Sequence, residues 1–304
     1  MDDRPDLLRK RVAVLMGGLS SEREISLRSG QAVLAGLGRR GYQAVPIDVD
    51  RSLYEPLKEE RIEVAFIALH GRWGEDGVVQ GLLEMMAIPY TGSGVLASAL
   101  AMDKCLCKVL MESLAIPTPA YKISSSREDC SFPLPFVIKP AREGSSVGIS
   151  IVRAESEAGP AVETAFAYGT KVLIEKYVEG REITVGIVNG NALPIVEVRP
   201  RSGVYDFTSK YTKGMTDYVV PAEITSDVER AAKEEALEIW RRFDLAGCAR
   251  IDMIVDHGSV PQVIDVNTSP GMTETSLVPK AWEHLGRTFD ELVEEILQGA
   301  GLKA

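Results

Sequence analysis

The first third of the chain alternates short apolar runs with segments of helical periodicity. Residues 12–16, 43–49 and 64–70 have the length and composition of β-strands, and helical patterns separate them. Such alternation predicts a parallel sheet flanked by helices. Ligands of such sheets gather at the carboxyl ends of the strands, and Gly17-Gly18 and His70-Gly71 fall there.

The chain is too long for a single hydrophobic core, since 304 residues predict two or three packed units. Its pattern changes after a break at residues 116–119, and from there short strands and turns surround one helix, predicted over residues 160–168. This texture is typical of a small α+β unit with an antiparallel sheet. Beyond residue 180 we expect one hairpin at Asn189-Gly190 and another near residue 257.

Local signals add three details. Residues 21–24 read Ser-Glu-Arg-Glu, which predicts a capping box at the start of a helix through about Arg40. Residues 88–90 predict a short strand before a Gly-rich turn. The polar stretch 199–221 has little periodicity, and a loop of that length is typical of a lid or a binding segment.

Composition excludes several classes of protein. A charge of −10 repels the phosphates of nucleic acid, so no nucleic-acid partner is expected. The sequence has no apolar run near the roughly 20 residues of a membrane helix, and its start lacks the apolar core of a signal peptide. We therefore expect a soluble cytoplasmic protein, with no membrane partner and with its four cysteines reduced.

Two segments near the C-terminus carry residues suited to a hard cation. Arg250 and Asp252 share one face of a predicted strand, as do Asp265 and Asn267 of the next one. Aligned, these faces supply two carboxylates, an amide oxygen and a guanidinium beside a polyphosphate. An ordinary salt-bridged sheet face is the alternative. The Pro-Gly loop of residues 268–273 follows directly, and its N–H groups can face an anion. The three dispersed histidines argue against zinc, so magnesium is favoured.

A second candidate site lies between residues 137 and 148. Lys139 ends an apolar strand, and a Gly/Ser-rich turn follows that can fold backbone donors over phosphate oxygens. A flexible hairpin loop with an exposed lysine is the alternative. Residues 172–178 form an apolar run that includes Glu175, which suits a nucleoside, although a plain core strand explains that run equally well.

The segment Gly92–Ala97 matches the G-x-G-x-x-A pattern of dinucleotide-binding proteins. That pattern requires a long strand before it and an acid at the end of the next strand. Only residues 88–90 precede it, and the acid at a suitable distance, Glu112, lies within a helical pattern. We interpret the segment as a turn that leads into a helix, and an NAD-dependent dehydrogenase as the weakest alternative.

Taken together, the motifs resemble those of the D-alanine–D-alanine ligases, members of the ATP-grasp superfamily. The resemblance runs nearly end to end. It comprises Gly17-Gly18 with residues 21–26, His70-Gly71 with residues 74–77, residues 89–92 and 102–104, Lys139-Pro140 with residues 143–148, Lys210-Tyr211, Arg250-x-Asp252 and residues 267–272.

The resemblance implies a three-domain ATP-grasp fold that combines α/β and α+β units. The domains are residues 1–101, an N-terminal parallel α/β domain, then residues 102–180 and 181–304, with ATP gripped between the last two and the stretch 199–221 as lid. It also implies a homodimer.

The resemblance implies roles for individual residues. Glu22 would bind the ammonium of the first D-alanine in a triad with Ser145 and Tyr211. Arg250 and the N–H of Gly271 would stabilise the tetrahedral intermediate. The other implied residues are His70, Lys210, Ser276 and Leu277 for the amino acids, Lys104, Lys139, Glu175, Lys176, Tyr177, Val178 and Glu182 for the nucleotide, and Asp252, Asp265 and Asn267 for two magnesium ions, with manganese as the alternative ion.

The implied activity is the ATP-dependent joining of two D-alanine molecules through an acylphosphate, for peptidoglycan and hence cell-wall synthesis. Tyr211 favours a peptide product over D-alanyl-D-lactate, because the ester-forming relatives tend to carry Phe at this position. Asp265 departs from the family pattern, which has Glu there, and the shorter side chain puts the metal stoichiometry in question. A nucleotide-binding protein without turnover, with Asp265 as the lesion, is the alternative.

Overall fold

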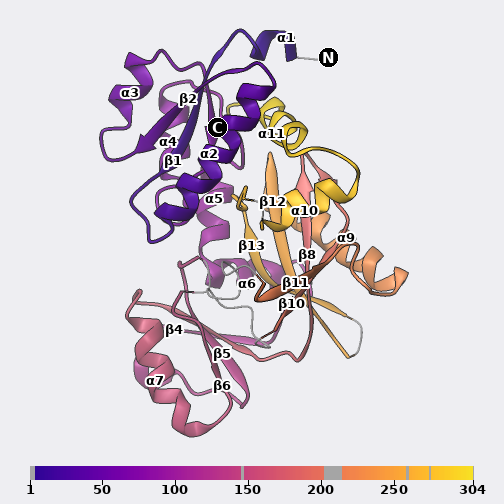
Figure 1. Ribbon diagram of the computed structural model, residues 1–304. Coiled ribbons are helices and arrows are strands. Elements are labelled where there is room, and N and C mark those ends of the chain that lie inside the picture. Colours follow the sequence, from indigo (N-terminus) through magenta and orange to yellow (C-terminus); the bar gives the residue numbers. More distant parts are fainter. Residues whose placement is uncertain (1–3, 145–146, 202–213, 258–259, 274, 304) are drawn as a thin grey trace.

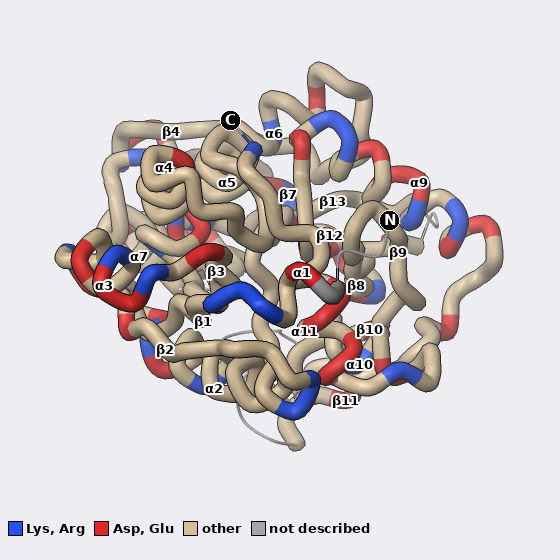
Figure 2. The backbone as a smooth tube through the Cα atoms, turned by 90° about the horizontal axis from the view of Figure 1, so that it is seen from above, with Lys and Arg blue, Asp and Glu red and all other residues tan. Residues whose placement is uncertain are grey.

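The computed structural model of the chain describes residues 4–144, 147–201, 214–257, 260–273 and 275–303, in three sheet-containing units (Figure 1). In this view the N-terminal unit is at the top, the central unit at the lower left and the C-terminal unit at the right. Figure 2 shows acidic and basic residues interspersed along the chain, for instance on α3 (Tyr54–Glu59) and α9 (Ser226–Arg242).

The N-terminal unit contains the predicted parallel sheet. Its strands run in the order β2-β1-β3 and all pair in parallel. The elements are α1 (Arg4–Leu7), β1 (Arg11–Gly17), α2 (Arg23–Arg39), β2 (Gln43–Val49), α3, β3 (Val64–Ile67) and α4 (Val78–Met85). Both predicted Gly positions follow strands of this sheet, which confirms the expected α/β arrangement.

The central unit contains an antiparallel sheet in the order β4-β7-β5-β6, with one helix packed against it. Its elements are β4 (Tyr121–Ser124), a short 3-10 helix (Arg127–Asp129), β5 (Phe136–Pro140), β6 (Ser150–Val152), α7 (Glu155–Phe166) and β7 (Val172–Lys176). This is the α+β unit expected from the sequence.

The C-terminal unit is built on a sheet in the order β11-β10-β8-β12-β13, with β9 beside β8. Its elements are β8 (Gly180–Val188), β9 (Asn191–Ala192), β10 (Val196–Pro200), β11 (Thr216–Val219), α9, β12 (Cys248–Asp256), β13 (Pro261–Asn267), α10 (Leu277–His284) and α11 (Phe289–Gln298). Asn189 and Gly190 both have positive φ, so the predicted hairpin turn is present.

Three local predictions were wrong. Helix α2 begins after Glu22, which is its N-cap and makes no side-chain cap hydrogen bond, so the Ser21 capping box does not form. Helix α7 begins well before Pro160, because the Glu157 carboxylate accepts the backbone N–H groups of residues 153 and 154 and starts the helix there. Residues 88–90 form no strand, and only Tyr90 pairs, through isolated bridges to Ala65 and Gly301.

The first and last segments of the chain share one hydrophobic core. Helix α11 packs against α2, and the cluster joins Val33 and Leu37 to Leu292 and Val293. Two ion pairs hold the same interface: Arg39 binds Asp290 and Arg40 binds the buried Glu294. The N-terminal unit is therefore completed by residues from the far end of the sequence.

The helices α5 (Val95–Met102) and α6 (Lys104–Ser113) connect the units. Several of their buried residues, including Ala101 and Met111, belong to the same core as Ile251 of β12. The central sheet has a separate core. The domain boundaries at residues 101/102 and 180/181 stay a prediction, and by its packing α6 lies with the C-terminal unit.

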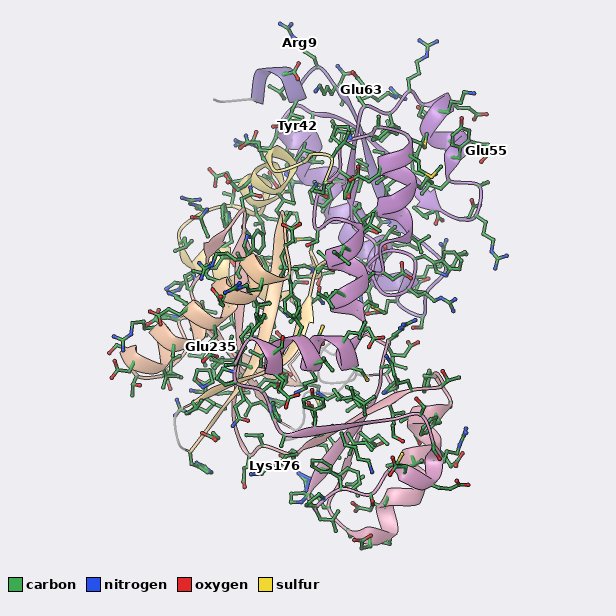
Figure 3. The ribbon with its side chains drawn as sticks, turned by 180° about the vertical axis from the view of Figure 1, so that it is seen from behind. Arg9, Tyr42, Glu55, Glu63, Lys176 and Glu235 are labelled. Atoms are coloured by element: carbon green, nitrogen blue, oxygen red, sulfur yellow. The ribbon has the colours of Figure 1, made fainter. Side chains whose placement is uncertain are left out.

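Glu235 on α9, labelled in Figure 3, generates a testable prediction. Burial, and then the charge of Glu234, raise the pKa of Glu235 to about 7, and its buried Oε2 has no hydrogen-bond partner among the described residues. The unfolded chain ionises this group near pH 4.5, so folding stability falls as pH rises from there to about 7.

We expect Glu235→Gln to stabilise the protein by about 1 kcal/mol at pH 8, with the difference fading below pH 7 and vanishing near pH 4.5. Urea denaturation across this pH range measures it. The control Glu234→Gln removes only the neighbouring charge and gives a smaller change. A difference that stays constant with pH contradicts the prediction.

Candidate functional site

A pocket opens where the N-terminal and C-terminal units meet the first turn of α6. Nine of the residues singled out from the sequence line it, and they come from segments far apart in the chain. These are Glu22, His70, Lys104, Arg250, Asp265, Asn267, Gly271, Ser276 and Leu277. The fold thus collects most of the predicted amino-acid and metal residues in one place.

Two carboxylates face each other on the adjacent strands β12 and β13. Asp252 lies directly opposite Asp265, and Arg250 lies opposite Asn267, so all four share one face of the sheet as predicted. Arg250 binds Asp252 through two hydrogen bonds of 2.8 Å, from Nε and Nη2. Thr184 of β8 donates to Asp252 Oδ1 at 2.6 Å. Asp252 is therefore held from two sides.

A register shift between β12 and β13 sets the direction of the Asp265 side chain. Asp252 pairs with Asp265, but Met253 pairs with Val263, so Ile264 is an extra residue on β13. Because of this bulge, Val263 and Val266 both reach the buried core while Asp265 faces the pocket. Without the bulge, Val263 and Asp265 would share a face.

His70 connects the N-terminal unit to the loop after β13. Its Nδ1 lies 3.0 Å from the carbonyl oxygen of Ser269, and its Nε2 lies 3.1 Å from Ser29 Oγ. Ser29 Oγ also accepts from the Met272 N–H, and Ser269 Oγ donates to the Leu69 carbonyl. These hydrogen bonds fix the loop that carries Gly271 against the end of β3.

Lys104 enters the pocket from the first turn of α6. Its Nζ donates to the Glu143 carbonyl at 2.7 Å and lies 3.6 Å from Asp265 Oδ1. Burial opposes the ammonium charge, but Asp265 and Glu75 more than offset this, so the pKa of Lys104 is raised. The buried Asp103 caps the helix by accepting from the N–H groups of the two residues after Lys104.

Glu22 is enclosed between two glycines from different units. A Cβ at Gly71 would lie 2.6 Å from Glu22 Oε2, and one at Gly144 would lie 2.5 Å from the same oxygen. Real Cβ atoms do not approach an oxygen so closely, so both positions require glycine while Glu22 keeps this orientation. The Glu22 side chain is 7% exposed, and its carboxylate lines the pocket.

Gly271, Ser276 and Leu277 form the wall at the start of α10. The Thr273 N–H donates to Ser276 Oγ at 2.9 Å, and Ser276 precedes the first helical residue, Leu277, which is buried. A Cβ at Gly271 would lie 2.9 Å from Ser276 Oγ. The turn is therefore compact, and it brings a backbone segment close to the residues of β12 and β13.

The predicted nucleotide residues lie mostly outside this pocket. Glu175 of β7 is only 2% exposed, and both Lys139 and Lys108 pair with its carboxylate. Burial would raise the pKa of Glu175, but the two ammonium groups outweigh burial and lower it. The carboxylate is thus held by lysines, and its predicted hydrogen bonds to a nucleoside stay a prediction.

The segment after Glu175 leads from the central unit to the C-terminal unit. Lys176 is exposed, and Figure 3 shows it where the two units meet. Tyr177 and Val178 are half-buried, and the Tyr177 N–H donates to the Pro135 carbonyl. Glu182 lies on β8 and pairs with Val198 and Ile254 across the sheet.

Three predicted residues, Ser145, Lys210 and Tyr211, lie outside the described residues. Two residues to which the sequence assigned no individual role lie in the pocket or near the predicted nucleotide residues. Glu75 lines the pocket, with its Oε1 3.4 Å from His70 Nδ1, and it belongs to a motif already noted. Lys108 contacts Glu175, and its spacing of four residues from Lys104 on one helix was the available signal.

The residues of β12 and β13 suit magnesium. Mg²⁺ takes oxygen ligands and is commonly bound by one or two carboxylates together with water and substrate phosphates. Asp252, Asp265 and Asn267 supply two carboxylates and one amide oxygen on one sheet face. Across the described ranges, no three or more His, Cys, Asp or Glu side chains gather as a metal site, so phosphate oxygens would have to complete the coordination.

Comparison with protein families gives matches in the N-terminal and in the C-terminal part of the chain. The family described as D-ala D-ala ligase C-terminus matches residues 115–298. The family described as D-ala D-ala ligase N-terminus matches residues 11–55 and 52–93. The two matches together include every pocket residue except Ala101, Met102 and Lys104.

Curated relatives are similar over the full length. The D-alanine–D-alanine ligase of Syntrophotalea carbinolica is 49% identical over 304 residues, which cover 99% of each chain. That of Anaeromyxobacter dehalogenans is 49% identical over 302 residues, covering 97% of this chain and 98% of the relative.

Solved structures are similar as well. The D-alanine–D-alanine ligase of Bacillus anthracis superposes with a TM-score of 0.86 at 36% identity, over 95% of this chain and 97% of the other. A second structure, titled as that enzyme complexed with ATP, superposes with a TM-score of 0.83 at 34% identity and the same coverage.

Proposed function

Because the chain belongs to the D-alanine–D-alanine ligase family, we propose that it joins two D-alanine molecules at the expense of ATP, through a D-alanyl phosphate, for peptidoglycan synthesis. The observation that carries this proposal is the pocket itself. It gathers an acid for an ammonium (Glu22), a guanidinium and a backbone N–H for an oxyanion (Arg250, Gly271), and a cation beside a metal-binding carboxylate (Lys104, Asp265).

The first D-alanine requires a partner for its ammonium, and Glu22 supplies the charge. The absence of a Cβ at Gly71 and Gly144 leaves the space that the Glu22 carboxylate occupies, so its orientation in the pocket depends on both glycines. Such positioning lowers the entropic barrier of the later steps. His70 is tied to Ser29 and Ser269 and keeps the neighbouring loop in place.

The D-alanine carboxylate is a poor electrophile, so it is first phosphorylated by ATP. Phosphoryl transfer leaves little covalent work for a protein, and charge neutralisation and positioning dominate. Lys104 is held as an ammonium at the Asp265 side of the pocket, where it faces the transferred phosphate. Bound magnesium would neutralise further charge on the phosphates.

The amine of the second D-alanine then attacks the acylphosphate. Negative charge develops on the carbonyl oxygen, and Arg250 and the Gly271 N–H each lower the barrier by about 2–4 kcal/mol, as comparable oxyanion donors do. Asp252 binds the Arg250 guanidinium on two nitrogens and so orients it. Lys210, Ser276 and Leu277 receive the second amino acid in this proposal.

The remaining nucleotide residues follow the family resemblance. Lys139 contacts phosphates, and Glu175, Lys176, Tyr177, Val178 and Glu182 hold the nucleoside at the junction of the central and C-terminal units. The support is their position on β5, β7, the segment after β7 and β8. The similar Bacillus anthracis enzyme crystallised with ATP supports nucleotide binding by this fold.

The reaction takes place in the cytoplasm in this proposal, where ATP is supplied. None of the described helices is long and apolar enough to cross a membrane. All four cysteines are buried and free, as expected in a reducing compartment.

We also propose that the chain forms a homodimer, as its family resemblance implies. Met85 of α4 and Leu96 of the adjacent α5 are 89% and 80% exposed, and they mark the face on which to test it. Sedimentation equilibrium should give twice the mass of one chain. The substitution Leu96→Asp should reduce the measured mass to that of one chain. A monomeric parent protein contradicts the proposal.

The direct test of function is ADP and phosphate release from ATP with D-alanine, compared with D-alanine plus D-lactate. We expect D-alanine to support turnover alone and the dipeptide to be the product near neutral pH. Preferential formation of the ester contradicts the peptide assignment. Tight ATP binding without D-alanine-dependent ADP release contradicts ligase activity altogether.

Gly144→Ala tests the role of Glu22. The added methyl would clash with Glu22 Oε2, so the carboxylate must shift. We expect the KM for the first D-alanine to rise at least about tenfold, which corresponds to 1.4 kcal/mol of lost binding, with thermal stability nearly unchanged. Gly169→Ala is the matched control, since a Cβ there meets nothing within 4 Å. Equal kinetics of the two variants would exclude this role.

Metal removal tests the magnesium proposal, which comprises two ions. Excess EDTA should abolish turnover, and added Mg²⁺ or Mn²⁺ should restore it. Because Asp265 is one methylene shorter than Glu, we expect Asp265→Glu to lower the Mg²⁺ concentration needed for half-maximal rate and Asp265→Asn to raise it. Identical magnesium dependence of the three proteins is evidence against a ligand role for Asp265.

A further inference from the structure

Lys108 is a buried lysine with no role in the pocket. It lies on α6, one turn after Lys104, and is 2% exposed. Its Nζ lies 2.7 Å from Glu175 Oε2 and also donates to Thr118 Oγ1. A lysine is rarely buried to this degree unless its charge is compensated, so the contact with Glu175 requires an explanation.

The Glu175 carboxylate binds two lysines, one on each oxygen. Lys139 of β5 approaches Oε1, and Lys108 approaches Oε2 from the opposite element, α6. Glu175 is itself 2% exposed. The cluster therefore holds two lysines for one contacting carboxylate, a surplus of one lysine.

That surplus matters when a nucleotide binds. In the proposed function, Lys139 turns its ammonium toward phosphate oxygens and so weakens its contact with Glu175. A buried carboxylate that loses its counter-charge is strongly disfavoured. With Lys108 in place, Glu175 keeps a cation at 2.7 Å whichever direction Lys139 takes.

Lys108 is also connected to the metal-binding strand. Thr118, which accepts from Lys108, donates to the Val263 carbonyl at 2.7 Å. The Val263 N–H in turn donates to the Pro117 carbonyl at 2.8 Å. The position of Lys108 is therefore set from two sides, by Glu175 of the central sheet and by β13.

We propose that Lys108 is a positioning residue for ATP: it compensates and holds Glu175, so that Lys139 is released to the nucleotide phosphates. This inference rests on the proposed function, in which Lys139 contacts phosphate. If the ion pair served only folding, its removal would change the affinities for the nucleotide and for D-alanine together.

The test is direct binding of ATP and Mg²⁺ without D-alanine, measured by calorimetry, together with KM values for both substrates. We expect Lys108→Met, which keeps the chain length and removes the charge, to weaken ATP binding at least tenfold and to change the KM for D-alanine less than twofold. Lys108→Arg should recover part of the loss. Lys122→Met is the control, because Lys122 pairs with Asp129 at the surface of the central unit, which also carries Glu175.

A second variant separates positioning from folding. Lys108→Arg restores the cation beside Glu175, so it should bind ATP more tightly than Lys108→Met even where the two variants unfold at the same temperature. Unchanged ATP binding in Lys108→Met overturns the proposal. So does a loss of ATP binding that Lys108→Arg does not recover, or one that is matched by an equal rise in the KM for D-alanine. If the parent protein binds ATP but does not ligate D-alanine, the proposed function is overturned instead. The ATP-binding data for the variants then still decide the role of Lys108.

Discussion

Two carboxylates stand opposite each other across β12 and β13, and much of the structure around them offsets that repulsion. Like charges at directly opposed positions of a sheet are destabilising. Asp252 is compensated by Arg250 on both oxygens and by the Thr184 hydroxyl, and Asp265 is approached by Lys104. The repulsion within the pair is thus offset by one guanidinium, one ammonium and one hydroxyl group.

The groups that compensate these carboxylates come from separate elements. Lys104 is placed by α6, whose first turn is capped by Asp103. The loop after β13 is bound to the N-terminal unit through Ser29, His70 and Ser269. A displacement of α6 takes the Lys104 ammonium away from Asp265, and a displacement of the loop takes Gly271 away from the pocket, so the site depends on the assembly of all these parts rather than on one strand pair.

Much of the fold could be predicted from periodicity and turn residues. The i, i+2 spacing correctly placed Arg250 with Asp252 and Asp265 with Asn267. The bulge at Ile264 could not be predicted, because it depends on which core residues the partner strand presents. The strand predicted over residues 88–90 was wrong for a related reason. Only Tyr90 pairs, and one of its partners, Gly301, lies near the other end of the chain.

The sequence predicted which residues form the candidate site better than it predicted the contacts that they make. Glu22 was assigned to a capping box as well as to a substrate, and the structure leaves its carboxylate in the pocket. Lys108 was missed because a lysine in a helical pattern indicates a solvated face, whereas here it is buried against a carboxylate from another unit. Such contacts arise from tertiary structure, which local patterns do not describe.

The shared core of α2 and α11 has a consequence for synthesis of the protein. Domains usually fold in the order in which they leave the ribosome, beginning with the N-terminal one. Here Val33 and Leu37 have their apolar partners in Leu292 and Val293 of α11, which is synthesised after the central unit and after most of the C-terminal unit. The nascent N-terminal unit therefore keeps an uncovered apolar surface until α11 has been synthesised, and until then it is a potential chaperone client.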